Sequence, residues 1–314
     1  MPLPKPRAGE SRNQFVRRCM IDDTSMSEYP DTQQRYAVCL SLSKDRKEII
    51  KQAKRKIATN FRKQVMLAEK KNYPIAYNYY LKEFDKASKM FIENPTINNQ
   101  NFNTLFNEID TKKMYSDMYK QTGLRFAKWY ADTFRKVAKK ELTPSVIEQN
   151  MERYATEKEN YLALVREVSA VSGVAKSTLK KVLAELLADE TFMSLGEEAR
   201  VREIMKRLKF KARWMARRIV RTETTASANF GIQLSASDIY GDDNLVKEWI
   251  ASDGSRTRDT HRTASSQYSN NPIPMNEPYL VGGSKMMFPS DTSLGARAKE
   301  VVNCRCVSIP FIPD

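Results

Sequence analysis

Cysteine is scarce in this sequence, with four residues among 314. So few cysteines in a chain of this size do not form a disulfide scaffold. One pair, Cys19 and Cys39, lies near the start, and we expect the two to share packing on a small helical hairpin. The second pair, Cys304 and Cys306, is separated by a single residue, so these two have no useful bond to make with each other. Three explanations are open: the two cysteines could pack as small apolar groups, bind a metal, or belong to a longer sequence pattern.

Long apolar runs are also absent. No stretch of the sequence is long and apolar enough to cross a bilayer, so we expect no membrane span. The opening residues, MPLPKPRAGESRN, include basic side chains but have no apolar segment behind them, unlike a secretory signal. We therefore expect the protein to be made and kept in a cytosol-like compartment.

Acidic residues are few relative to basic ones. The chain has 53 Lys and Arg against 38 Asp and Glu, which gives a formal net charge of +15. This excess favours a polyanionic partner, and nucleic acid is the foremost candidate. Charge by itself gives salt-sensitive binding without sequence preference. The plentiful Tyr and Phe exclude a disordered tail.

The first half of the chain is predicted to be helical. Residues 1–44 form a Pro-rich segment followed by a short helical hairpin, whose two helices have Ser11 and Asp31 as N-caps. Residues 45–141 place apolar side chains at three- and four-residue spacing, which predicts long helices in an elongated arm or bundle. Pro74 is expected to start a new helix within this region.

The second half, residues 142–314, is predicted to form one module in two parts. Helices continue over residues 142–236. Over residues 237–314, short runs of alternating apolar and polar residues stand between polar loops, which predicts a small α+β cap. The expected fold class is therefore mainly α with a small C-terminal α+β module.

Residues 200–221 are predicted to form a strongly basic helix. This stretch has ten basic side chains and a single acid, Glu203. A solvated surface is the ordinary explanation of such a run. However, self-repulsion along one helix is costly unless an anion offsets it, and two aromatic side chains share the basic side. We therefore expect DNA phosphate or an acidic protein surface to bind there. The candidate residues are Arg202, Lys206, Lys209, Phe210, Arg213, Trp214 and Arg217.

Three stretches of the second half contain an ordered set of polar and aromatic residues. They read RRIVRTETTASANFG at 217–231, KEWIASDGSRTRDTHRTASS at 247–266 and VVNCRCVSI at 301–309. In this order they resemble the phage Mu F-like family of minor head, or head morphogenesis, proteins. The matching residues are Arg221, Thr222, Glu223, Asn229, Gly231, Trp249, Asp253, Arg256, Arg258, His261, Pro289, Asn303, Cys304, Arg305 and Cys306. One departure is RTASSQYSNN after the histidine, where the family has a Gly-containing turn.

The resemblance implies a structural minor capsid protein of a tailed phage, assembled in the bacterial host cytoplasm and placed in the head near the portal. Its partners would be the portal protein, the major capsid protein and packaged double-stranded DNA. The opening segment also resembles a short piece found near the termini of other phage structural proteins. We expect structural roles for the motif residues Arg221, Glu223, Asn229, Trp249, Arg256, Arg258, Asn303 and Arg305, with Asn303 and Arg305 bracing a loop around His261.

The Asn-Cys-Arg-Cys segment has two interpretations. On a strand, Cys304 and Cys306 face the same side. Together with His261, and with Asp253 or Asp259 as a fourth ligand, they would supply the donors that zinc prefers. The alternative is that both cysteines are buried small residues that pack a terminal strand.

Enzymatic interpretations remain open beside the structural one. His261, the only histidine, could act as a general base or in a nuclease centre. We favour a His locked by a hydrogen bond to a nearby Asp. Arg221 and Glu223 could form an ADP-ribosyltransferase or toxin site, but we favour a buried ion pair. Because the sequence ends soon after Cys306, we expect no C-terminal toxin domain. A free DNA-binding accessory protein is a further alternative.

Overall fold

The computed structural model describes residues 3–5, 7, 10–42, 46–95, 104–134, 162–252 and 254–313. These residues are mainly helical with a small C-terminal sheet, which confirms the predicted fold class. The chain divides into two compact units, Met1–Phe61 and Arg62–Asp314. This division differs from the boundary predicted at 44/45. The boundary predicted at 141/142 lies outside the described residues.

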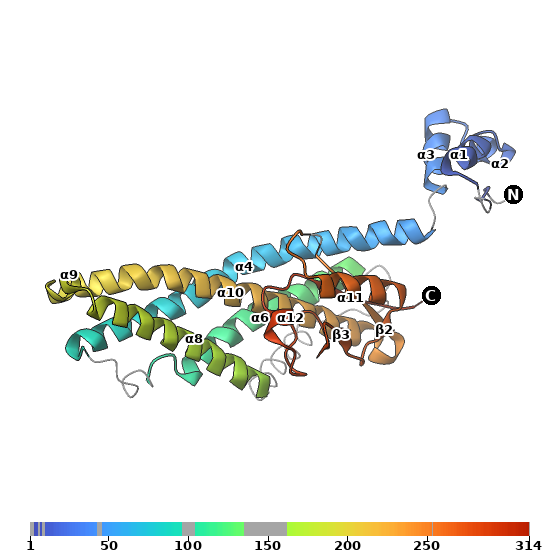
Figure 1. Cartoon of the computed structure of the whole chain (residues 1–314). Helices are drawn as coiled ribbons and strands as arrows, with labels where there is room; N and C mark the ends of the chain where they lie inside the picture. Colours follow the sequence, from blue (N-terminus) through green and yellow to red (C-terminus); the bar gives the residue numbers. More distant parts are fainter. Residues whose placement is uncertain are drawn as a thin grey trace. The chain divides into compact units, whose positions relative to one another are not determined.

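Where the structure describes it, the first unit begins with three short helices (Figure 1), which are α1 (Arg12–Met20), α2 (Asp23–Glu28) and α3 (Thr32–Leu42). Ser11 caps α1 through a capping box with Gln14, as predicted. The carboxylate of Asp31 accepts a hydrogen bond of 2.7 Å from the backbone N–H of Gln34, which confirms the second cap. The middle helix, α2, was not predicted. It begins after Asp22, whose side chain accepts from the N–H of Ser25.

Cys19 and Cys39 are joined by a disulfide bond. Because α1 packs against α3, the two Cα atoms lie 5.7 Å apart, a distance that a disulfide spans. Phe15 and Val16 are buried around the two sulfurs. The predicted closeness of the cysteines is confirmed, whereas the interpretation as shared packing without a bond is wrong.

The second unit is built on a helical bundle (Figure 1). Its helices are α4 (Arg46–Glu93), which begins in the first unit, α6 (Glu108–Phe134), α8 (Leu162–Leu187), the short α9 (Glu190–Met193) and α10 (Glu197–Tyr240). α10 packs along α6 and α8, and one apolar core includes side chains of α4, α6, α8 and α10. Over the described residues, the two predicted helical regions 45–141 and 142–236 therefore form a single bundle.

Pro74 lies inside α4 and does not start a new helix, contrary to the prediction. A proline inside a helix removes one backbone hydrogen bond and crowds the preceding turn. Buried side chains on both sides of it, such as Val65 and Ala68 before and Tyr80 and Phe84 after, are fixed in the interior. This burial offsets the local cost, so the helix continues.

The helices α6 and α10 cross in very close contact at Gly231. A Cβ atom at this position would lie 2.5 Å from the carbonyl oxygen of Gly123 and 3.2 Å from the backbone nitrogen of Ala127. Only a residue without a side chain allows the two backbones to approach this far. Gly231 therefore fixes the spacing between α6 and α10.

The C-terminal module is a small α+β unit, as predicted. Its three-stranded antiparallel sheet has the order β2-β1-β5, formed by β1 (Val246–Ile250), β2 (Ile273–Pro274) and β5 (Val307–Phe311). A separate hairpin joins β3 (Tyr279–Val281) to β4 (Ser284–Met286). The helices are α11 (Asp259–Asn270), α12 (Ala298–Val301) and the short 3-10 helix η1 (Asp242–Asn244). Among the described residues, no helix has the length and apolar character that a bilayer span requires.

Candidate metal centre

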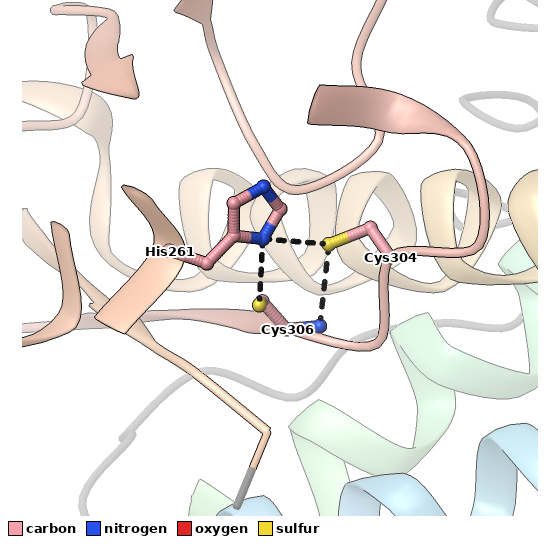
Figure 2. A group of neighbouring side chains, drawn as sticks. All are labelled: His261, Cys304 and Cys306. Atoms are coloured by element: carbon pink, nitrogen blue, oxygen red, sulfur yellow. Dashed lines mark hydrogen bonds between the residues drawn. The ribbon is translucent and has the colours of Figure 1, made fainter. Parts of the chain in front are cut away.

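His261, Cys304 and Cys306 meet in the interior of the C-terminal module (Figure 2). The Nδ1 atom of His261 lies 3.3 Å from the sulfur of Cys306 and 3.6 Å from the sulfur of Cys304. The three side chains are at most 2% exposed. These residues, predicted as candidate ligands, therefore form a compact group of one nitrogen and two sulfur donors that could hold a metal ion.

Local backbone structure places the three donors. His261 is the third residue of α11, and not part of a loop as expected. The two cysteines precede β5 and do not lie on a strand, contrary to the prediction. Asn303 turns the chain between α12 and Cys304 with a φ of 58°, a left-handed conformation that asparagine tolerates better than most residues. This turn directs both sulfurs towards the imidazole.

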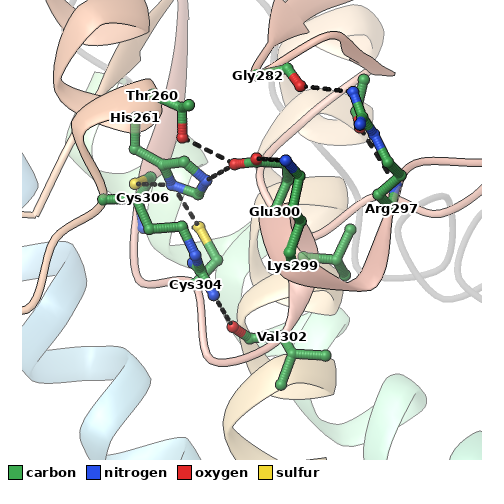
Figure 3. Close-up of polar contacts among 12 residues, drawn as sticks. Thr260, His261, Gly282, Arg297, Lys299, Glu300, Val302, Cys304 and Cys306 are labelled. Atoms are coloured by element: carbon green, nitrogen blue, oxygen red, sulfur yellow. Dashed lines mark hydrogen bonds and ion pairs between the residues drawn. The ribbon is translucent and has the colours of Figure 1, made fainter.

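Glu300 is the functional residue that the sequence analysis missed. Its Oε2 atom lies 3.2 Å from Nε2 of His261, and the hydroxyl of Thr260 donates a hydrogen bond of 2.8 Å to the same oxygen (Figure 3). Nε2 forms no hydrogen bond among the described residues, so this contact is a close approach of the carboxylate to the ring nitrogen. The histidine is therefore held by a glutamate of α12, and not by a nearby aspartate as expected.

The two thiols of the group differ in acidity. Burial opposes a thiolate at Cys304, but hydrogen bonds from Cys306 and His261 to its sulfur outweigh burial and lower its pKa well below the usual value. The hydrogen bond to Cys304, together with burial, raises the pKa of Cys306 well above the usual value. Without a bound metal, these surroundings therefore favour a single thiolate, and it forms at Cys304.

Trp249, for which a structural role was predicted, packs against His261 inside the module. It is fully buried on β1, and its ring meets the rings of His261 and Tyr279 edge-on at centroid distances of 5.5 and 5.3 Å. Edge-to-face contacts of this kind add to the stabilisation from buried area. Trp249 therefore fixes one side of the imidazole ring while the two sulfurs approach its Nδ1 atom.

Asn229 joins the bundle to the terminal strand. Its Nδ2 atom donates to the carbonyl of Thr225 at 2.9 Å and to that of Cys306 at 3.2 Å. Its Oδ1 atom accepts from the N–H of Ser308 at 2.8 Å. The hydroxyl of Thr225 donates to the carbonyl of Cys304 at 2.9 Å. The structural role predicted for Asn229 is therefore clear: α10 hydrogen-bonds the backbone on both sides of the cysteines.

The predicted ion pair between Arg221 and Glu223 does not form among the described residues. Side chains two positions apart on a helix do not face each other. The buried Glu223 instead accepts a hydrogen bond from the hydroxyl of Tyr119 on α6. Arg221 is half-buried, and burial together with the nearby charge of Arg305 lowers its pKa, while Glu69 on α4 opposes this change.

Arg305 also has a different role from the one predicted. Its guanidinium forms an ion pair of 3.0 Å with Glu69, so it ties the Asn-Cys-Arg-Cys segment to α4 and does not brace His261. Asn303 donates its N–H to the hydroxyl of Thr222 on α10 at 3.0 Å. Both residues are thus structural, but they attach the segment to the helical bundle.

The remaining predicted residues of the module have mixed outcomes. Arg258 precedes α11 and donates to the carbonyl of Val302 at 2.5 Å, which braces the turn before the cysteines. Arg256 is exposed. The side chain of Asp259 is 97% exposed and pairs with Arg262, so it is not a ligand of the buried group. Asp253 lies outside the described residues.

The basic side of α10 is exposed, as the sequence predicts. All seven candidate residues lie at the surface: Arg202, Lys206, Lys209, Phe210, Arg213, Trp214 and Arg217. Phe210 is 68% exposed and Trp214 54%. Several of these residues line a surface groove of about 620 Å³, which Asp85 also lines. Among the described residues, no ion pair reaches Lys209, Arg213 or Arg217, whereas Arg202 pairs with Glu198.

No protein-family model, curated protein or solved structure matches this chain. The resemblance to the Mu F-like proteins therefore depends on the ordered residues of the sequence. The contacts above bring Asn229, Trp249, His261, Cys304 and Cys306 together. Glu223 and Gly231 instead contact α6, and Arg305 contacts α4.

Proposed function

We propose that this chain is a minor capsid, or head morphogenesis, protein of a tailed phage, located inside the head near the portal. It docks on the portal protein or the major capsid protein and contacts packaged double-stranded DNA without reading its sequence. The observation that supports this function most directly is the meeting of the Mu F-like residues at one junction. Asn229, Trp249, His261 and the Asn-Cys-Arg-Cys segment come from distant parts of the chain and fasten one module together.

Burial favours a role in binding and assembly over turnover. His261 is 1% exposed and Glu223 is 6% exposed, so neither presents its functional atoms to a substrate in solution. Both are engaged by the protein itself, through Glu300 and Tyr119 respectively. A general base or an ADP-ribosyltransferase glutamate needs contact with a substrate, and these two side chains instead hold elements together.

The exposed basic side of α10 is the surface that we assign to the anionic partner. Lys209, Arg213 and Arg217 follow one another along it with the exposed rings of Phe210 and Trp214 between them. Free cations spaced along one helix fit a regular row of phosphates, and each phosphate contact releases a bound counterion. The exposed rings give the same surface apolar area for an acidic protein partner.

The DNA contact can be tested by reversing two charges. In the Arg213→Glu/Arg217→Glu variant, we expect weaker binding to a duplex of random sequence and a slope of log K against log salt reduced in magnitude by about 2. The matched control is Lys128→Glu/Lys285→Glu, which changes the net charge equally at two exposed residues away from α10. Fluorescence anisotropy over a salt series measures both. Equal losses in the two variants would show that only total charge matters.

Association with the head needs a separate experiment. Heads assembled from the portal and major capsid proteins of the same phage are sedimented with the full chain, before and after nuclease treatment. A minor capsid protein remains in the head fraction after the DNA is digested. A free DNA-binding accessory protein leaves it, and that result would replace the capsid proposal.

A further inference from the structure

We propose that His261, Cys304 and Cys306 bind one zinc ion through Nδ1 and the two sulfurs. Zinc binds nitrogen at about 2.0–2.1 Å and sulfur at about 2.3 Å, and tetrahedral angles then set these two ligand atoms about 3.5 Å apart. The observed separations of Nδ1 from the two sulfurs are 3.3 and 3.6 Å. The donors therefore already stand at the spacing that a tetrahedral zinc ion imposes.

The surroundings of the histidine fit the same site. Histidines that bind a metal through one ring nitrogen commonly direct the other nitrogen to a carboxylate, which fixes the ring and its tautomer. Here Nδ1 faces the sulfurs and Nε2 faces Glu300, which is itself held by Thr260 (Figure 3). With zinc on Nδ1, the proton must lie on Nε2, and the Glu300 carboxylate is the acceptor 3.2 Å away. Glu300 is thus a positioning residue for the ligand His261.

The sulfurs are also prepared for a metal. Cys304 and Cys306 are free thiols and not a disulfide. The backbone N–H of Cys306 approaches the sulfur of Cys304 at 3.5 Å (Figure 2), a contact that stabilises negative charge on that sulfur. Two thiolates side by side repel each other, and a divalent cation between them removes this repulsion. Simple packing of two small apolar residues needs neither the imidazole nor the buried carboxylate.

The described residues supply three protein donors, which leaves one coordination position for water or a further oxygen ligand. The ion joins α11 to the turn that precedes β5, because His261 belongs to the helix and both cysteines to the turn. Unfolding would separate these ligands, so the binding free energy of zinc contributes to the stability of the module. The site is structural, and it goes beyond the proposed function in assembly and DNA contact.

The first experiment measures metal in the full chain purified without chelator and with reductant. We expect one zinc per chain, a lower thermal midpoint after removal by chelator, and recovery on adding Zn²⁺. Co²⁺ added to the stripped protein should give the absorption bands of a tetrahedral thiolate complex. Less than about 0.1 zinc per chain, with no such bands, would overturn the proposal. Both readings use the wild-type chain, so a misfolded variant cannot obscure the result.

Variants then test the ligands. Cys304→Ser, Cys306→Ser and His261→Ala should each lose most of the zinc. The matched control is Cys19→Ser/Cys39→Ser, which removes the other two cysteines and should keep one zinc per chain. Glu300→Gln should keep the stoichiometry but bind zinc about 10–100-fold more weakly in competition with a chromophoric chelator. Zinc lost equally from the control variant, or unchanged by the three ligand variants, would place the metal elsewhere.

Discussion

At the scale of single residues, Asn229 shows how one side chain can connect two parts of a fold. It is fully buried, and its amide satisfies the carbonyl of Cys306 and the N–H of Ser308, which the sheet leaves to it. A buried backbone group that loses its only partner costs more than the hydrogen bond itself contributes. The energetic importance of Asn229 therefore lies in the groups that it would leave unsatisfied.

Replacing Asn229 should consequently destabilise the second unit. For Asn229→Ala we expect the free energy of unfolding to fall by about 3 kcal/mol, because two buried backbone groups lose their partner at about 1–3 kcal/mol each. Urea denaturation measures the change. The matched control is Asn270→Ala, an exposed asparagine in α11, which should stay within about 0.5 kcal/mol of wild type. Similar values for the two variants would contradict the bridging role.

For single residues, sequence reasoning succeeded where the interaction is local or where the residue types are characteristic of one kind of site. Ser11 and Asp31 were predicted as caps because capping depends on residues within one turn. His261 was grouped with the cysteines because imidazole and thiol form a recognisable donor set. Glu300 and the Arg305–Glu69 pair were missed, because a carboxylate has many possible partners. The fold brings Arg305 to a residue 236 positions away, a distance that no local pattern reports.

At the scale of helices, the contact between α6 and α10 depends on an absent side chain. Gly231 allows the backbone of α10 to touch that of α6, so any Cβ atom must push the helices apart. Gly173 in α8 has the opposite surroundings, since a Cβ atom there would meet nothing within 4 Å. The two glycines therefore have opposite roles in helices of the same bundle.

Alanine at these two positions should change stability in opposite directions. Gly231→Ala is expected to lower the free energy of unfolding by about 1–3 kcal/mol through overpacking. Gly173→Ala should raise it by up to about 1 kcal/mol, since alanine favours a helix and meets no obstacle. Parallel chemical denaturation of the two variants compares them directly. A stabilising effect at both positions would mean that α6 and α10 are not in close contact at Gly231.

Helices were predicted well from apolar spacing, but some of their ends were not. Pro74 has the local chemistry of a helix start, and only the packing of α4 against the bundle keeps the helix continuous through it. The short helix α2 has too few apolar residues to give a periodic pattern. Local signals determine where a helix is possible, whereas the common core determines where it ends.

At the scale of the whole molecule, the chain separates into two compact units with different covalent chemistry. The first unit contains the Cys19–Cys39 disulfide, and the cysteines described in the second are free. Disulfides persist in oxidising surroundings and are reduced in the cytosol. Adding reductant should therefore lower the stability of the first unit and leave that of the second unchanged.

Reduction is expected to act on one unit alone. Opening a loop of this length costs about 3 kcal/mol, so hydrogen exchange should quicken in α1 and α3 when reductant is added. Residues 62–314 should keep their protection. Hydrogen exchange read by mass spectrometry measures both units in one sample. The Cys19→Ala/Cys39→Ala variant serves as control because it should not respond to reductant. Unchanged exchange of α1 and α3 in the wild type would contradict the expectation.

The pairing of β1 with β5 affects the order in which the parts of the chain fold. Trp249 stands opposite Ser308 in the sheet, so the chain must close a loop of about 60 residues before the two strands can join. Helical turns form from neighbouring residues and need no such search. On refolding, the helices should therefore acquire structure first and the sheet last, and His261 would meet its two cysteines only at this final step.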